Sequence, residues 1–478
     1  MDKREFIKVS GALAVGSMIP APLWALAKKK GRLRTAHIGV GNMGASDLKA
    51  IASHELVDVV ALCDVDSDAL AAAQKLYPNA KIYADYRTML KKMKRKIDAV
   101  IVSTPDHTHA PASMLAMKMK KDVYCQKPLT HHVAEARAMN KLAKKKRLVT
   151  QMGIQVHSFY DYKLATLLIQ SGIIGKVHTV RAWSPKNWGY DGPEPQGSDE
   201  IPENLDWNLW LGTSAKRDYK KDIYHPGNWR KLMDYGCGTL GDMGVHIFDT
   251  PYNALALDVP KTIVNKCKKS NGFGFPEHNE VTYEFPGTPF TTDKLTWIWS
   301  DGVGAPGVHE DLLLPVSEDV VSKEGTDDGK DASVEEKISL DAKIAKEGKL
   351  PSQGAMFIGE KGRLLLPHFM QLPQKIVDGK YVDISAEIAA VEKANKMGEP
   401  IRNYATEGPK HYHQFVDACL GTDECTAPFS YAARLTETIL LGVIAGRFPN
   451  ETLHWDSEKA KFSEEEANQY LDAEYRDF

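Results

Sequence analysis

The chain has 478 residues, a length that favours two domains over one. Its composition, 43% hydrophobic and 26% charged, is typical of an ordinary globular protein. A formal net charge of −2 gives no electrostatic reason to expect a nucleic-acid partner.

Cysteine usage argues against both disulfides and metal. Six cysteines in a chain of this length do not form a disulfide framework, and no two have metal-ligand spacing. We therefore expect buried free thiols and no metal site. Cys419 and Cys425 are close enough in sequence to make a disulfide between them worth checking.

Residues 1–27 predict an export signal. A basic start precedes an apolar stretch at residues 9–26, and residues 25–27 fit an A-x-A cleavage site. Glycine and proline in that stretch argue against a permanent membrane span. Residues 3–8, K-R-E-F-I-K, resemble a twin-arginine signal with Lys3 in place of the first arginine. We therefore expect a periplasmic or secreted protein; the alternative is a disordered amphipathic tail.

The next segment predicts a dinucleotide-binding turn. Residues 35–44 read T-A-H-I-G-V-G-N-M-G, in which an apolar strand runs directly into G-x-G-x-x-G before a helix. Gly39 permits the tight turn, Gly41 lets the backbone approach a pyrophosphate, and Gly44 lets helix and strand pack closely. The pyrophosphate would lie at the helix N-terminus, beside Asn42 and Met43.

A second strand supports this interpretation. Residues 57–63 are apolar and end at Asp64, about 20 residues after the last glycine, where this fold places the acid that binds the adenosine ribose. An acid at this position favours NAD over NADP, because a carboxylate would repel a 2′-phosphate.

Strands alternate with helices through residues 33–152, which predicts a doubly wound parallel sheet, the N-terminal Rossmann domain of an α/β protein. Ligands bind beyond the carboxyl ends of such strands. We therefore expect Asp64, residues 104–107 and residues 126–128, which all follow strands, to share one crevice. The expected cofactor contacts there are Thr104, Pro105, His107, Gln126 and Lys127.

The pattern changes over residues 153–478. Strands are expected at residues 177–183, 281–285, 294–299 and 362–366, without regular crossover helices between them. This predicts a C-terminal α/β domain with an open, largely antiparallel sheet. Its free face suits a homo-oligomer, a dimer or tetramer. Residues 300–353 are polar and are expected to form a surface insertion.

Two segments carry candidate chemistry. One delivers Lys127 to the crevice, and residues 241–249 read G-D-M-G-V-H-I-F-D. A helix beginning near Leu240 would place Asp242 and His246 on one face. A histidine near a carboxylate can remove a hydroxyl proton, so His246 is a candidate base and Lys127 a candidate cation for alcohol oxidation by NAD. A structural histidine near a helix start and a zinc site are the alternatives.

Loops before this segment are rich in aromatic and polar residues. Aromatic faces cover the apolar faces of pyranoses, and polar groups bond their hydroxyls, although loop tryptophans can equally serve packing. The expected substrate contacts are Trp188, Tyr224, Asn228, Trp229, Arg230, Asp242 and His246.

The motifs together resemble the Gfo/Idh/MocA family of nicotinamide-dependent sugar oxidoreductases. The resemblance rests on G-V-G-N-M-G at 39–44, C-D at 63–64, S-T-P-D-H-T-H at 103–109, Q-K-P at 126–128 and the segment at 241–249. It implies a catalytic group at Lys127, Asp242 and His246. Gln126 departs from the family's Glu, and an amide cannot hold Lys127 by charge. Residues 205–212 and 225–230 resemble a secreted subgroup.

These features lead to a functional expectation. We expect an NAD-dependent oxidoreductase acting on a secondary hydroxyl of a pyranose or glycoside, with C3 as a candidate carbon. The first alternative is an NAD-dependent glycoside hydrolase resembling α-N-acetylgalactosaminidases, in which oxidation is transient and permits elimination. The second is a cofactor-holding binding protein, which the presence of Lys127, Asp242 and His246 disfavours.

Export would also affect the cofactor. Free nicotinamide nucleotides should be scarce outside the cytoplasm. We therefore expect tightly bound NAD that is reoxidised in place by a second sugar or by an electron-acceptor partner protein.

Overall fold

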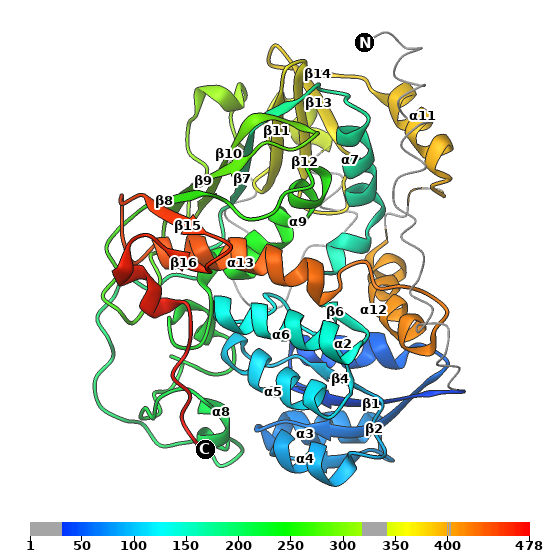
Figure 1. The fold of residues 1–478 in the computed structure, drawn as a ribbon, viewed down its shortest axis with the longest axis vertical. Helices are drawn as coiled ribbons and strands as arrows, with labels where there is room; N and C mark the ends of the chain where they lie inside the picture. The colour runs from blue at the N-terminus through cyan, green and yellow to red at the C-terminus, as the bar shows by residue number, and fades with distance from the viewer. Residues whose placement is uncertain (1–30, 318–341, 399, 401–402) are drawn as a thin grey trace.

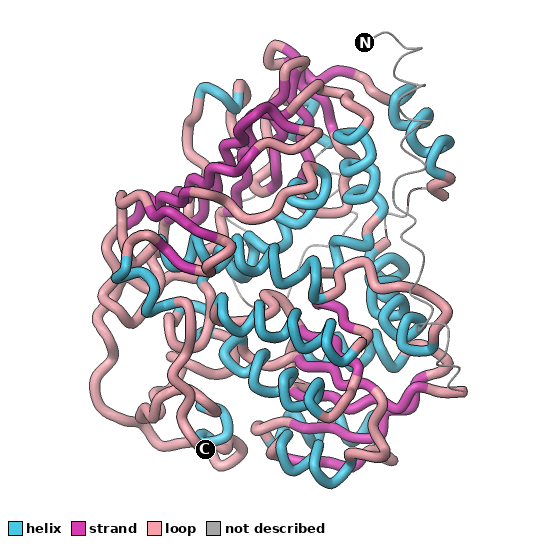
Figure 2. The backbone as a smooth tube through the Cα atoms, in the orientation of Figure 1, coloured by secondary structure: helices cyan, strands magenta, loops and turns pink. Residues whose placement is uncertain are grey.

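A computed structural model describes residues 31–317, 342–398, 400 and 403–478. The expected export signal at residues 1–27 and the central part of the expected insertion at 300–353 lie outside the described residues. The strands form two separate groups, with helices between and around them (Figure 2).

The N-terminal group is a six-stranded parallel sheet in the order β3-β2-β1-β4-β5-β6, which confirms the predicted doubly wound sheet. The order reverses between β1 and β4, the point where ligands bind in such sheets. The strands are β1 (Leu33–Ile38), β2 (Val57–Cys63), β3 (Lys81–Tyr83), β4 (Ala99–Val102), β5 (Asp122–Cys125) and β6 (Thr150–Met152). The helices are α2 (Met43–Ala52), α3 (Ser67–Leu76), α4 (Tyr86–Met93), α5 (Asp106–Lys118) and α6 (Val133–Lys146).

A helix from the C-terminal part of the chain completes the core of this sheet. Tyr412 and Phe415 of α12 (Tyr404–Leu420) share a buried cluster with Ile101 of β4 and Tyr124 of β5. Side chains on alternate positions of these strands point the other way, toward α5 and α6. The Rossmann unit is therefore buried on both faces, and residues from beyond position 152 supply part of one layer, beside α2.

The second group is a ten-stranded sheet in the order β14-β13-β12-β11-β7-β10-β9-β8-β15-β16. Its β7 and β10 pair in parallel, and the other neighbours pair antiparallel, as predicted for the second α/β domain. The strands are β7 (Val177–Ser184), β8 (Thr262–Cys267), β9 (Asn279–Pro286), β10 (Thr291–Asp301), β11 (Gly354–Gly359), β12 (Gly362–Pro367), β13 (Gln374–Val377), β14 (Lys380–Val382), β15 (Leu453–Asp456) and β16 (Lys461–Phe462). The further α-helices are α7 (Tyr160–Gln170), α8 (Trp207–Leu211), α9 (Val245–Ala254), α11 (Ser385–Asn395) and α13 (Phe429–Ala445).

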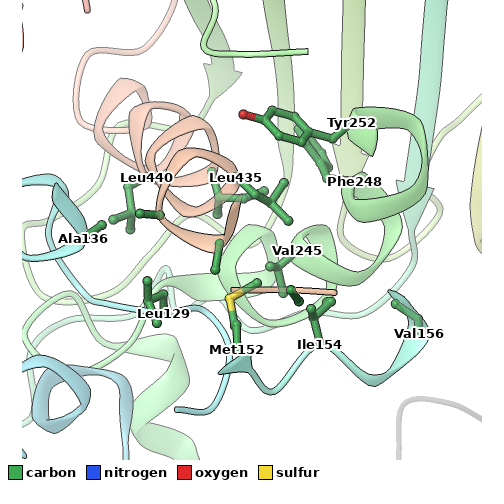
Figure 3. Packing of buried hydrophobic residues seen from close by; sticks show 14 of the residues in the cluster. Leu129, Ala136, Met152, Ile154, Val156, Val245, Phe248, Tyr252, Leu435 and Leu440 are labelled. Carbon is green, nitrogen blue, oxygen red and sulfur yellow. The ribbon is translucent and has the colours of Figure 1, made fainter. Parts of the chain in front are cut away.

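One continuous core joins the two halves. Helix α13 packs against α6 and crosses the centre of the molecule between the two sheets (Figure 1). Leu129 and Met152 of the N-terminal half lie in the same buried cluster as Val245 of α9 (Figure 3). Leu435 and Leu440 of α13 complete this contact. Because close-packed interiors deform little, side chains from the two halves keep fixed relative positions.

The outer face of the ten-stranded sheet is only partly free. Leu312 and Leu350, both within residues 300–353, pack on Trp183, Met356 and Leu365, which point away from the helices. The described part of this segment therefore contributes an apolar cover to the sheet, which its polar composition does not predict. The open part of the face carries polar pairs such as the 2.6 Å hydrogen bond from Thr296 Oγ1 to Glu284 Oε1.

Candidate active site

A cavity of about 1350 Å³ lies at the carboxyl ends of β1, β4 and β5. The glycine-rich turn forms one end, and residues of the C-terminal half, among them Trp188, Arg230 and His246, line the other. The volume exceeds that of a typical small-ligand pocket, so the cavity has room for more than one bound group. The strand-end residues other than His107 therefore share one crevice, as predicted from their positions.

The glycine-rich turn leaves no room for side chains. Gly39 has a φ of +81°, and a Cβ there would lie 2.4 Å from the Ser103 carbonyl oxygen. A Cβ on Gly44 would lie 2.3 Å from the Gly39 carbonyl oxygen. Both distances are impossible for real atoms, so only glycine fits. Gly41, Asn42 and Met43 line the cavity at the start of α2, the arrangement that suits a pyrophosphate.

Asp64 is fixed at the end of β2. Its Oδ2 accepts a 2.8 Å hydrogen bond from the Val40 N–H, and its Oδ1 accepts one of 2.9 Å from the Asp66 N–H. Burial raises the pKa of the Asp64 carboxyl, although these hydrogen bonds oppose the rise. The side chain lines the cavity where a ribose would lie.

Sequence reasoning missed a second carboxylate beside it. Asp66 accepts a 2.8 Å hydrogen bond from Asn204 Nδ2 and lies 3.0 Å from His225 Nε2. These contacts bring a loop of the C-terminal half over the nucleotide end of the cavity. Asp66 follows the predicted Asp64 by two positions and also caps α3, so its place in the sequence was a usable signal.

The predicted cofactor residues after β4 divide into two groups. Thr104 and Pro105 line the cavity. His107 does not; its Nε2 lies 3.0 Å from the Trp210 carbonyl oxygen, and its ring packs against Trp210 and Tyr235. His109 lines the cavity, with its ring nitrogens 2.8 Å from two backbone carbonyl oxygens.

Gln126 also lines the cavity, but its amide is directed at a buried carboxylate. Its Nε2 lies 2.9 Å from Asp47 Oδ2, and its Oε1 accepts a hydrogen bond from the Lys127 backbone N–H. Asp47 also accepts hydrogen bonds from Ser103 Oγ at 2.6 Å and from the Tyr412 hydroxyl at 2.8 Å.

Lys127 and Asp242 form an ion pair across the cavity. Lys127 Nζ donates a 2.7 Å hydrogen bond to Asp242 Oδ1 and a 2.9 Å one to the Asp242 carbonyl oxygen. The Trp188 indole N–H donates to Asp242 Oδ2 at 2.7 Å. Burial by itself would raise the pKa of Asp242, but the charges of Lys127, Arg230 and Lys186 hold it well below its usual range. Asp242 is therefore an ionised group that positions Lys127.

His246 lies one turn further on. The chain turns into a π-helix at Leu240–Gly244 and continues as α9, so the expected helix starts with a widened turn. Burial, with the charge of Lys127, lowers the pKa of His246 well below its usual value, which keeps the imidazole neutral. Its Nδ1 has no hydrogen-bond partner among the described residues. Asp249 instead faces His157, at 2.9 Å, and Tyr431.

The expected substrate contacts also divide. Trp188, Trp229 and Arg230 line the cavity, and the Arg230 guanidinium carbon lies 4.3 Å from the centroid of the Trp229 ring. Tyr224 is buried in an aromatic cluster, and Asn228 Nδ2 donates to the Asp222 carbonyl oxygen. The structure places neither of these last two side chains on the cavity.

The end of the cavity near Lys127 and His246 contains three residues to which the sequence assigned no role. Asp106 lies in the crevice, as expected from its place after the strand end; burial raises its pKa to about 7. Lys186 follows the end of β7, and His368 follows β12. The His368 ring centroid lies 6.0 Å from that of His246. No spacing or periodicity in the sequence points to these last two residues.

Two further expectations concern metal ions and thiols. Across the described ranges, no group of three or more His, Cys, Asp or Glu side chains could hold a metal ion. All six cysteines are free thiols, Cys419 and Cys425 included. Within the same part of the chain, no helix combines the length and apolar character needed to cross a membrane.

Comparison with known sequences identifies the family. Residues 33–154 match the model of the Gfo/Idh/MocA oxidoreductase family with an NAD-binding Rossmann fold, and residues 163–268 match its C-terminal alpha/beta domain. An inositol 2-dehydrogenase of Salmonella typhimurium is 30% identical over 260 residues, 53% of this chain and 72% of that protein. A glycosyl hydrolase family 109 protein of Stenotrophomonas maltophilia is 36% identical over 136 residues, which span 26% of this chain and only 29% of that protein.

Solved structures show the same fold at low identity. A myo-inositol dehydrogenase from Lactobacillus casei in complex with NAD(H) and myo-inositol has a TM-score of 0.53 at 16% identity, covering 89% of this chain and 97% of that one. A levoglucosan dehydrogenase in complex with NADH and L-sorbose has a TM-score of 0.56 at 15% identity, covering 87% and 98%. The chain belongs to the Gfo/Idh/MocA oxidoreductase family, with an NAD-binding Rossmann domain followed by the family's α/β domain.

Proposed function

We propose that this protein is an NAD-dependent oxidoreductase that oxidises or reduces a secondary hydroxyl of a pyranose sugar or glycoside, with C3 as the candidate carbon. The observation that carries the proposal is the presence of Lys127, Asp242 and His246 in one cavity with the glycine-rich turn. The names of two relatives, inositol 2-dehydrogenase and levoglucosan dehydrogenase, support a polyhydroxylated substrate.

The nucleotide end of the cavity fits NAD. Gly39 and Gly44 leave space that any Cβ would fill, α2 begins at the turn, and Asp64 is held rigidly for a ribose. When bound, NAD supplies the acceptor for a hydride. Thr104, Pro105 and Lys127 would lie toward its nicotinamide end.

The chain's own residues supply the proton chemistry. His246 is neutral, so it can accept the proton of a substrate hydroxyl, a step that contributes about 10²–10⁴-fold in typical enzymes. Lys127 Nζ uses two of its three N–H groups on Asp242, which leaves one for the substrate oxygen. Its positive charge stabilises negative charge that develops there. Asp242 holds the ammonium in position.

A substrate screen tests the proposal. Protein with bound NAD is incubated with a panel of pyranoses and glycosides, and the products are analysed by mass spectrometry and NMR. The proposal expects a keto-sugar, with the position of the new carbonyl deciding whether C3 is the reacting carbon. If no member of a broad panel is oxidised or reduced by protein that holds NAD, the proposal fails.

A hydrolase is the second candidate. The observation that favours it is the match to the glycosyl hydrolase family 109 protein, at 36% identity. In that chemistry oxidation acidifies a neighbouring C–H, the aglycone is eliminated, water adds to the resulting double bond, and the hydride returns to the carbonyl carbon of the sugar. Incubation with a p-nitrophenyl glycoside separates the two: phenol release without added NAD supports the hydrolase, and an accumulating keto-sugar supports the dehydrogenase.

Four further proposals concern the protein's setting. We propose export through the twin-arginine-like segment at residues 1–27, a periplasmic or secreted location, tightly bound NAD, and reoxidation by a second sugar or a partner protein. The contacts of Asp66 with Asn204 and His225, which link the two halves beside the nucleotide end, support slow cofactor release. Homo-oligomerisation through the open part of the ten-stranded sheet is a further proposal, testable by light scattering.

A further inference from the structure

The end of the cavity lined by Lys127, Asp242 and His246, here called the catalytic end, carries more positive charge than its carboxylates balance. Lys127, Lys186 and Arg230 line it, against Asp242 and Asp106. Asp242 is shared by two of these cations, with Lys127 Nζ at 2.7 Å and Arg230 Nε at 3.4 Å. The pKa of Asp106 is raised to about 7 by burial, so near neutral pH this carboxyl is only partly ionised.

Lys186 has no ion-pair partner among the described residues, yet its backbone is firmly placed. Its N–H donates to Ser184 Oγ at 3.3 Å, and its carbonyl oxygen accepts from the Gly302 N–H at 3.2 Å. Lys186 lines the cavity, and its charge lowers the pKa of both Asp242 and His246, which line the end of the cavity opposite the glycine-rich turn. Lys186 is half-buried, so its ammonium is accessible from the cavity and can form a charge-assisted hydrogen bond with an anionic group of a ligand.

Arg230 lines the same cavity as Lys186 and is held in place by aromatic rings. The guanidinium carbon lies 4.3 Å from the Trp229 ring centroid and 5.5 Å from that of Trp188, so the side chain is held against two aromatic rings. A fixed guanidinium presents its N–H groups in a plane that matches the oxygens of a carboxylate or phosphate. The same aromatic rings offer apolar faces to a sugar ring.

We propose that the sugar substrate carries an anionic group, a carboxylate or a phosphate ester, which Lys186 and Arg230 bind beside the carbon that reacts. This inference rests on the proposed sugar oxidation in the same cavity and specifies its substrate class. Bound oxidised nicotinamide adds another positive charge, which increases the advantage of an anionic substrate.

Binding measurements test the inference without requiring turnover. Calorimetric titrations of the NAD-loaded protein compare D-glucuronate, D-galacturonate and D-glucose 6-phosphate with D-glucose and D-galactose, and with inorganic phosphate alone. At least one sugar anion is expected to bind about tenfold or more tightly than its neutral counterpart, with a preference that falls as salt is raised. Comparison of uronate with phosphate ester identifies the kind of anion.

Variants assign the preference to Lys186. Lys186→Met is expected to reduce the ratio of anionic to neutral affinity about tenfold, and Lys186→Arg to retain most of it. Lys91→Met, at an exposed position of α4, is the matched control and should change nothing. NAD content and thermal melting show that each variant is folded.

Several outcomes would overturn the inference. One is equal or tighter binding of the neutral sugars, and another is inorganic phosphate alone binding as well as any sugar anion. A third is that Lys186→Met leaves the preference for anions unchanged. A fourth is loss of NAD in Lys186→Met, which would assign the lysine to the cofactor. Failure of the proposed function looks different: sugars would bind, anionic or neutral, but none would be oxidised or reduced.

Discussion

The side-chain amide of Gln126 donates to the carboxylate of Asp47, with Nε2 lying 2.9 Å from Oδ2. The resemblance to the family pointed to a glutamate at position 126 as a charge partner for Lys127, and the structure shows that Asp242 takes that part. A glutamine here can donate to Asp47, which a carboxylate cannot do. The glutamine that replaces the family's glutamate is thus explained by its buried neighbour Asp47, which needs a hydrogen-bond donor.

Gln126→Glu should therefore destabilise the protein by about 2 kcal/mol at neutral pH, because two carboxylates would share a buried site. Repulsion and burial would raise the folded-state pKa of the pair, so the deficit should be smallest in acid and grow as pH rises through that pKa. Urea unfolding at several pH values measures this. The double variant Asp47→Asn with Gln126→Glu restores a donor and acceptor and should recover most of the loss; equal stability of Gln126→Glu and wild type would contradict the account.

His246→Ala should reduce turnover about 10²–10⁴-fold on the best substrate while leaving NAD bound, because the imidazole acts on the substrate and other residues hold the nucleotide. Steady-state rates and the NAD content of the purified variant measure both effects. His178→Ala, at an exposed position near the start of β7, is the control. A His246→Ala variant within about threefold of wild type would remove His246 from the mechanism.

Asp106 should make stability depend on pH. Burial raises its folded-state pKa from 3.8 to about 7, so the folded protein binds a proton that the unfolded chain releases between these values. Asp106 therefore contributes its full stabilisation of the folded protein below about pH 4. This stabilisation, roughly 4 kcal/mol at most, is lost as pH rises to about 7. Asp106→Asn should flatten this part of the stability profile. The exposed Asp293→Asn serves as control. An unchanged stability profile in Asp106→Asn would refute the assignment.

NAD should remain bound through purification. Protein purified without added nucleotide is denatured, and the supernatant is assayed for NAD(H), with near-stoichiometric recovery expected. Protein that is folded yet almost free of NAD(H) would contradict tight binding and point to an enzyme that uses a soluble cofactor pool.

The parts of the site that the sequence predicts are those set by local pattern. Asp64 and Lys127 follow buried strands of a parallel sheet, and strand ends on one edge meet in space whatever the loops do. Lys186 and His368 enter the cavity from loops of the mixed sheet, whose β7–β10 parallel pairing depends on long-range contacts. No short-range pattern encodes that arrangement.

The sequence also does not predict the direction in which the side chains of a loop point. Trp229 and Arg230 line the cavity, whereas Asn228, in the same short 3₁₀ turn, bonds the preceding loop. Tertiary packing decides which side of such a turn faces the cavity, and composition does not report it. The sequence also does not predict the apolar cover from Leu312 and Leu350, because two leucines in a polar segment show no periodicity.

The most direct test of the central claim is a single-turnover experiment on protein with bound NAD. It is mixed with a substrate sugar that carries deuterium at the reacting carbon, and the absorbance of reduced nicotinamide is followed in a stopped-flow instrument. The account predicts reduction of the bound cofactor, slower with the deuterated sugar than with the unlabelled one, deuterium recovered on the nicotinamide, and about 10²–10⁴-fold slower reduction in His246→Ala. Product formation with no reduced nicotinamide and no deuterium transfer at any time would contradict it.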